Sequence, residues 1–206
     1  MADFKSRKKD IAWIASDCKT PSRREEYVNS MKNVVNSSLK IDIYGKCGNL
    51  KIQDFQGGPK LDILVDKAYE EISKDYKLYL SLENSICTDY ITEKFFNALK
   101  FGVLPITNVD KNTAKFAPPH SYINVNDFKS PEDLMKTLEN ISQNPELYNS
   151  YFWWNEFYNV QTKDQFSNPI EYQCRFCDVL NENGFKSAND YSKFGRYWNQ
   201  CQRDTL

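Results

Sequence analysis

Short apolar runs with the character of β-strands alternate with helix-like segments along most of this chain, and this alternation restricts the fold more than any other feature. The runs show either apolar–polar alternation or a short continuous apolar stretch. They are Ile11–Ser16, Lys40–Tyr44, Tyr76–Leu82, Val103–Thr107 and Tyr122–Val125. Strands separated by helices form a mostly parallel sheet that is covered by helices on both faces. We therefore predict an α/β fold of the Rossmann-like type.

Helix start and stop signals lie between these runs. Ser22 and Glu25 have the spacing of a capping box, while Thr92 and Gly102 bracket a helix predicted over Glu93–Phe101. Further helices are predicted over Val65–Ile72, after Ser130-Pro131 and after Asn144-Pro145. Ligands of such folds bind beyond the carboxyl ends of the strands, so the loops that follow the strands are where chemistry is expected.

Charge and hydropathy exclude several function classes. The 206 residues fit one or at most two domains, and the formal net charge of -1 leaves no basic field for a nucleic acid or an anionic membrane. The basic run Lys5–Lys9 is expected to be a solvated terminal segment. No apolar stretch of about 18 residues occurs, and no signal-peptide pattern follows Met1, so the chain itself contains no predicted membrane span.

Cysteine usage points to an oxidising compartment. The even count of six cysteines is compatible with disulfides, whose pairing the sequence leaves open. The cysteines are Cys18, Cys47, Cys87, Cys174, Cys177 and Cys201. Pairing of Cys18 with either Cys87 or Cys47 is conceivable, because all three follow predicted strands. Asn36 and Asn140 each begin an N-glycosylation sequon.

Two cations stand in the opening turns of helices that follow predicted strands. Arg24 opens the helix after Ile11–Ser16, and Lys94 opens the helix after Tyr76–Leu82. A helix N-terminus carries a partial positive charge and free N–H groups, so a further cation there disfavours the helix but favours a bound anion. Either the two cations share a phosphate ligand, or they are two exposed charges without a common role.

Other familiar sites are absent from the sequence or only weakly indicated. There is no Gly-x-Gly-x-x-Gly motif, no P-loop and no constellation of metal ligands, so no obligatory metal or cofactor is expected. His120 is the only histidine, and it is expected to be a solvated loop residue. Cys174 and Cys177 form a single Cys-x-x-Cys pair, which is too little for a zinc site and favours a structural disulfide role.

The segment 83–94, ENSICTDYITEK, resembles the signature of glycosyltransferase family 10, the α1,3/α1,4-fucosyltransferases. The resemblance extends from about residue 10 to about residue 201 and includes IDIYG at 41–45, YINVNDF at 122–128 and SYFWW at 150–154. The cysteine placement is similar to that of invertebrate members. The resemblance implies the C-terminal, GDP-fucose-binding half of a two-domain glycosyltransferase of the B type.

The resemblance also implies roles for individual residues. Arg24 and Lys94 are expected to hold the pyrophosphate of GDP-fucose. Tyr90, Glu93 and Asn84 are expected to contact the ribose, the phosphates or the fucose, and Ser16, Asp17 and Tyr79 to lie along the guanosine side. The family's general base is expected in an N-terminal acceptor domain, for which this chain has no counterpart.

The resemblance implies a division of the chain into three segments and leaves two candidate functions. Residues 1–9 are expected to form a basic N-terminal segment, 10–160 the donor-binding domain, and 161–206 a cysteine-containing extension that packs on it. The expected function is transfer of fucose from GDP-fucose, with inversion, to an N-acetylglucosamine hydroxyl of a glycan in the Golgi lumen, with a type II membrane protein as parent. The alternative is a nucleotide-sugar-binding fragment or paralogue without turnover.

Overall fold

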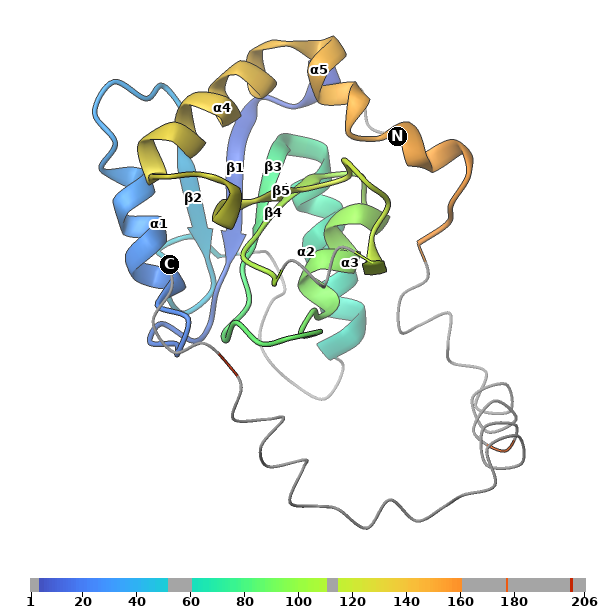
Figure 1. Ribbon diagram of the computed structural model, residues 1–206, viewed down its shortest axis with the longest axis horizontal. Helices are drawn as coiled ribbons and strands as arrows, with labels where there is room; N and C mark the ends of the chain where they lie inside the picture. Colours follow the sequence, from blue (N-terminus) through green and yellow to red (C-terminus); the bar gives the residue numbers. More distant parts are fainter. Residues whose placement is uncertain (1–3, 52–60, 111–114, 161–176, 178–200, 202–206) are drawn as a thin grey trace.

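A five-stranded, fully parallel sheet forms the centre of the computed structural model, which describes residues 4–51, 61–110 and 115–160 together with residues 177 and 201. The strand order is β2-β1-β3-β4-β5 (Figure 1). The strands are β1 (Lys9–Ile14), β2 (Ile41–Tyr44), β3 (Tyr76–Ser81), β4 (Leu104–Thr107) and β5 (Ile123–Asn124). The helices are α1 (Arg24–Lys32), α2 (Leu61–Asp75), α3 (Glu93–Lys100), α4 (Pro131–Gln143) and α5 (Pro145–Ser150). Short 3-10 helices are η1 (Phe4–Ser6), η3 (Val125–Asp127) and η4 (Trp153–Glu156).

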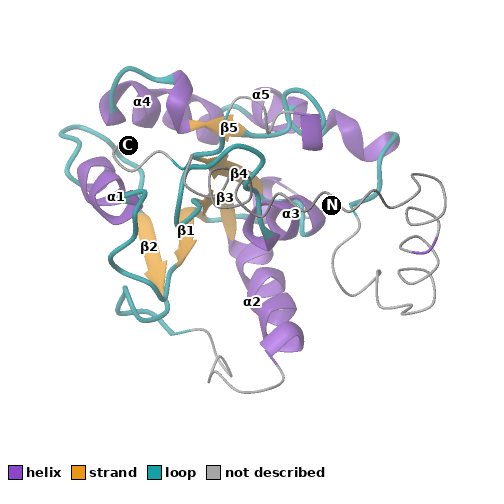
Figure 2. Cartoon of the chain, turned by 60° about the horizontal axis from the view of Figure 1, so that its bottom comes forward, coloured by secondary structure: helices purple, strands orange, loops and turns teal. Residues whose placement is uncertain are grey.

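Both faces of the sheet are covered, as predicted (Figure 2). Alternate residues of β1 divide between two apolar clusters, because successive side chains of a strand point to opposite faces. Ile11 and Trp13 pack in the larger cluster with residues of α1 and α4, whereas Ala12 packs with residues of α2 and α3. Burial on both faces explains why the strand segments appear as short apolar runs.

Strand positions agree with the sequence prediction to within a few residues. The strand predicted over Ile11–Ser16 is β1, which spans Lys9–Ile14. It begins earlier because Lys9 already pairs with Tyr76 of β3, and it ends at Ile14, where the chain turns away. The predicted helix Val65–Ile72 is longer and spans Leu61–Asp75.

Helix capping follows the prediction at two helices and departs from it at one. The Ser130 side chain accepts a hydrogen bond from Asp133 N at the start of α4, and Gly102 adopts a positive φ of 67° just after α3, as expected. The capping box at Ser22 is wrong. The Ser22 hydroxyl donates to the main-chain oxygen of Glu83, and Glu25 instead accepts from Thr20.

The basic N-terminal run is not wholly solvated, so this prediction is wrong at Arg7. Arg7 is only 2% exposed; its guanidinium donates to the Tyr148 hydroxyl and lies 5.9 Å from the centre of the Tyr148 ring. Lys9 belongs to β1 and pairs with Asp75 at 2.9 Å. The run therefore anchors the start of the sheet to α5 and α2.

Two disulfides are present. Cys18 pairs with Cys47, one of the two partners considered from the sequence, and Cys87 pairs with Cys201. Cys177 is exposed and forms no disulfide with another described cysteine. Cys174 lies outside the described residues. Among the helices that the structure describes, none is long and apolar enough to cross a bilayer.

Candidate functional site

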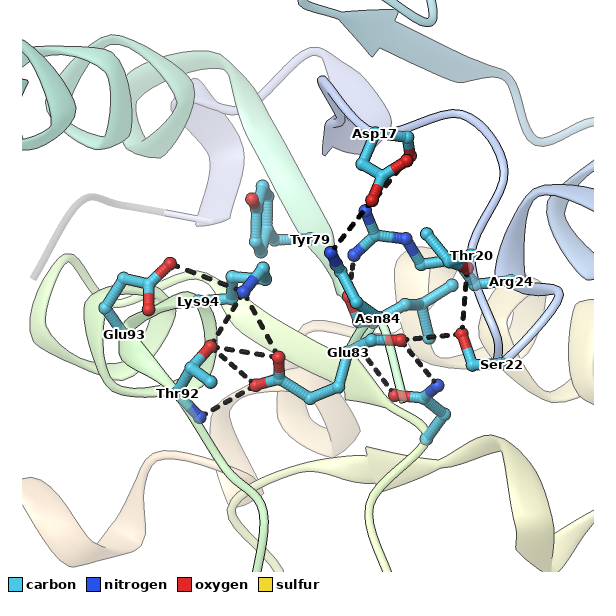
Figure 3. Close-up of polar contacts among 12 residues, drawn as sticks. Asp17, Thr20, Ser22, Arg24, Tyr79, Glu83, Asn84, Thr92, Glu93 and Lys94 are labelled. Atoms are coloured by element: carbon cyan, nitrogen blue, oxygen red, sulfur yellow. Dashed lines mark hydrogen bonds and ion pairs between the residues drawn. The ribbon is translucent and has the colours of Figure 1, made fainter. Parts of the chain in front are cut away.

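The topology places the candidate site at the carboxyl ends of β1 and β3. In the order β2-β1-β3-β4-β5, the chain leaves β1 toward α1 on one face of the sheet and leaves β3 toward α3 on the other. Two adjacent strands whose connections diverge in this way form a topological switch point, where open α/β sheets bind their ligands. Figure 3 shows the polar side chains that gather at this point.

The main chain just beyond β3 is held by donors from the start of α1. The Arg24 guanidinium donates to Leu82 O at 2.5 Å, and the Ser22 hydroxyl donates to Glu83 O at 2.8 Å. The Ser22 amide donates to Asn84 O at 3.0 Å. These bonds join the two diverging loops into one platform.

Asn108, directly after β4, holds the same segment from the other side. Its Oδ1 accepts from Glu83 N at 2.7 Å, and its Nδ2 donates to Glu83 O at 3.2 Å. Asn108 is fully buried, and its side-chain amide bonds the main chain of Glu83 beyond the last register pair of β3 and β4, Ser81 and Thr107. Sequence reasoning missed Asn108, although its place after a predicted strand could have indicated it.

The buried carboxylate of Glu83 organises the start of α3. It accepts from Thr92 N at 2.7 Å, from the Thr92 hydroxyl at 2.7 Å and from Lys94 Nζ at 3.1 Å. The Glu83 side chain is 1% exposed, whereas that of Lys94 is 22% exposed. Glu83 was not predicted as a site residue, yet it fixes the position of one that was. Thr92 is the N-cap of α3, as predicted, but its hydroxyl bonds to Glu83 instead of a helix N–H.

Arg24 lies in the opening turn of α1, as predicted, but it is almost fully buried. Its guanidinium lies 5.6 Å from the centre of the Trp13 ring and donates to Asp17 O at 3.3 Å. Burial lowers the pKa of Arg24, and the nearby carboxylates of Glu83 and Asp17 act against this shift. Its Nε atom is buried without a hydrogen-bond partner.

Of the other predicted site residues, Asp17 and Glu93 accept hydrogen bonds from these cations. Asn84 Nδ2 donates to the exposed Asp17 carboxylate at 3.4 Å, Ser16 is exposed, and Tyr90 is half-buried. Tyr79 differs, because it is buried between β3 and α2, where its hydroxyl accepts from Tyr69 at 3.0 Å and burial raises its pKa. Its predicted contact with guanosine stays a prediction.

Buried polar atoms without partners also gather at the carboxyl edge. They are Arg24 Nε, Asn84 Oδ1, Ser81 Oγ and Thr107 Oγ1. Ser81 and Thr107 are register partners on β3 and β4. Buried polar groups are nearly always satisfied, so such a cluster points to a bound ligand or ordered water. Within the described ranges, no group of three or more metal-binding side chains occurs.

Comparison with known proteins identifies the family of this chain. The model of glycosyltransferase family 10 (fucosyltransferase) C-term matches residues 4–194. The chain is 33% identical over 201 residues to alpha-(1,3)-fucosyltransferase C and 36% identical over 197 residues to glycoprotein 3-alpha-L-fucosyltransferase A, both from Drosophila melanogaster. These matches cover 97% and 94% of this chain but 43% and 35% of the relatives, so the chain spans less than half of their length.

Solved structures agree at the level of the fold. A crystal structure of an alpha1,3-fucosyltransferase with GDP superposes with a TM-score of 0.62 at 20% identity, over 88% of this chain and 49% of that one. The corresponding structure with GDP-fucose gives a TM-score of 0.57 over 79% of this chain and 42% of that one. The predicted fold, one half of a glycosyltransferase of the B type, is confirmed.

Proposed function

The chain belongs to glycosyltransferase family 10, the fucosyltransferases, and from this premise we propose that it is the donor-binding part of an α1,3-fucosyltransferase. In this proposal GDP-fucose binds at the carboxyl ends of β1 and β3, with its diphosphate between Arg24 and Lys94. The curated relatives carry the name of this activity, and the related crystal structures hold GDP or GDP-fucose.

One observation carries the proposal: two helices with a cation in their first turn start at the two sides of the switch point. Arg24 is the first residue of α1 and Lys94 the second residue of α3. Each helix N-terminus adds free N–H groups and a partial positive charge. A cation in the first turn weakens an isolated helix, so its presence at both helices favours a shared anionic ligand.

This arrangement suits the chemistry of fucose transfer. Cleavage of the bond between fucose and GDP leaves additional negative charge on the β-phosphate. Fixed cations and helix N-termini stabilise that charge in the transition state without reorganising. We propose that Arg24 and Lys94 supply this stabilisation and that no divalent metal is required for it.

Transfer with inversion also needs an acceptor and a base that removes the proton of the acceptor hydroxyl. We assign both to the part of the relatives' length that lies outside the region matched here, with an N-acetylglucosamine residue of a glycan as acceptor. A second candidate function is donor binding without turnover, which needs neither an acceptor nor a base.

We further propose that the protein works in the Golgi lumen. The two disulfides support an oxidising compartment. Both sequon asparagines, Asn36 in the loop before β2 and Asn140 on α4, are exposed and thus accessible to glycosylation.

Calorimetric titration with GDP tests the assignment. Lys94→Ala is expected to weaken binding by about tenfold to a hundredfold, because a charge-assisted contact to phosphate contributes about 1.5–3 kcal/mol. Lys136→Ala, an exposed lysine of α4, is the matched control and is expected to leave the affinity unchanged. Equal affinities for wild type and Lys94→Ala would refute the assignment.

A further inference from the structure

The chain segment between β3 and α3 is fixed at both ends by buried side chains. Asn108 bonds the main chain of Glu83, and the Glu83 carboxylate accepts from Thr92 N at 2.7 Å. Residues 85–91 lie between these fixed points, and we name them the donor loop. Tyr90, a predicted donor contact, belongs to this loop. The position of the loop therefore sets where Tyr90 lies relative to a bound donor.

The donor loop turns back on itself at its centre. Tyr90 N donates to Cys87 O at 3.2 Å, and Asp89, between them, has a positive φ of 60°. This left-handed conformation is uncommon for a residue other than glycine, and it persists where surrounding contacts hold it. Contacts from outside the loop are therefore needed to keep the turn in one position.

A disulfide and an ion pair reach this turn from distant parts of the chain. Cys87 is bonded to Cys201, 114 positions away. Asp89 pairs with Lys115 at 2.8 Å, and the two side chains are 32% and 56% exposed. Exposed ion pairs contribute little to stability, whereas a covalent bond keeps its two residues together as long as it is intact. The disulfide is thus the stronger of the two contacts.

We infer that Cys87 and Cys201 are positioning residues of the donor site: their disulfide keeps the donor loop in its binding conformation before the nucleotide sugar arrives. This inference rests on the proposed function, and it gives a role in donor binding to a cysteine that lies 114 residues beyond the loop. A loop that is already ordered loses little conformational freedom when a ligand binds. Affinity is then higher than for a loop that the ligand itself must order.

Calorimetric titration with GDP-fucose, in wild type and in the double variant Cys87→Ser/Cys201→Ser, tests the inference. The double variant is expected to bind about tenfold more weakly, because binding then has to order the loop. Leu138→Ala is the control, since it removes a fully buried side chain of α4 and destabilises the fold without touching the loop. Its affinity is expected to stay within about twofold of wild type, because the two sites are distant and independent.

Hydrogen exchange separates positioning from a general loss of stability. The Tyr90 amide, which bonds to Cys87 O within the loop, should exchange faster in the double variant, and GDP-fucose should restore its protection. A disulfide that only stabilises the fold would speed exchange in β1 and β3 as much as at Tyr90, and would leave donor affinity as in Leu138→Ala. That pattern would overturn the inference.

Asp89→Asn covers the case in which the double variant does not fold. It removes the ion pair and keeps a residue type that adopts the left-handed conformation readily. The disulfide remains, so donor affinity is expected to stay within about twofold of wild type. A loss as large as that expected for the double variant would assign the position of the loop to the ion pair and contradict the inference.

Lys94→Ala distinguishes a failure of this inference from a failure of the proposed function. If Lys94→Ala and the double variant both bind GDP-fucose as wild type does, the donor-site assignment fails, and the inference with it. If Lys94→Ala weakens binding and the double variant does not, the donor site stands and the disulfide has no positioning role.

Discussion

Replacing Glu83 with glutamine should lower the free energy of unfolding by more than the same substitution does at an exposed glutamate. The buried carboxylate accepts only, from Thr92 N and Oγ1 and from Lys94 Nζ. A glutamine amide has one accepting oxygen, and its NH₂ group must face either the Thr92 amide or the Lys94 ammonium. One donor thereby faces another donor in either orientation.

The expected loss follows from these contacts. A hydrogen bond to a charged group contributes about 1.5–3 kcal/mol, and an unsatisfied buried donor costs about 1–3 kcal/mol. Lys94 is 22% exposed, so water compensates part of the loss on its side. We therefore expect the free energy of unfolding to fall by about 2–3 kcal/mol. With a urea m value of about 2 kcal/mol/M, the midpoint should shift by about 1–1.5 M.

Urea unfolding followed by tryptophan fluorescence measures this shift, because Trp13 and Trp154 are buried. Glu26→Gln is the matched control, since Glu26 pairs with Arg23 at the surface, where both side chains are more than half exposed. The control is expected to lower the free energy of unfolding by less than about 1 kcal/mol. If Glu83→Gln and Glu26→Gln lowered it equally, Glu83 would not organise the start of α3.

Three further predictions concern the disulfides, metals and turnover. Replacing Cys18 and Cys47 together with serine should lower the free energy of unfolding by about 3.5 kcal/mol, because the bond closes a loop of 29 residues; mass spectrometry that finds Cys18 unpaired in secreted protein would contradict this disulfide. EDTA should leave GDP affinity unchanged, and abolished binding would reveal a metal site. The 206 residues alone should transfer no fucose from GDP-fucose to N-glycan acceptors at a meaningful rate, since base catalysis is typically worth about two to four orders of magnitude; robust turnover would show that the base lies within them.

Local sequence signals were enough for the architecture. The apolar runs located every strand of the described sheet, and Ser130-Pro131 and Gly102 marked helix ends correctly, because these residue types act through their own backbone geometry. Their limits appear at Ser22 and Glu25, where the spacing of a capping box was present. The Ser22 hydroxyl instead donates to the distant Glu83 O, and the Glu25 carboxylate accepts from Thr20 in the preceding loop.

Long-range contacts could not be predicted from the sequence. The order of residues placed Arg24 and Lys94 at helix starts, but it gave no indication that Arg24 is buried against Trp13 or that Lys94 is saturated by three acceptors. The pairing of Cys87 with Cys201 joins residues 114 positions apart, and several other pairings of six cysteines were equally compatible with the sequence.

A crystal structure of this chain with GDP is the most direct test of the proposed donor site. We expect electron density for the diphosphate at the carboxyl ends of β1 and β3, between the N-termini of α1 and α3. We also expect a phosphate oxygen within hydrogen-bond distance of Lys94 Nζ. Density for GDP at any other edge of the sheet, or a Lys94 ammonium without a phosphate contact when GDP is bound, would contradict the proposal.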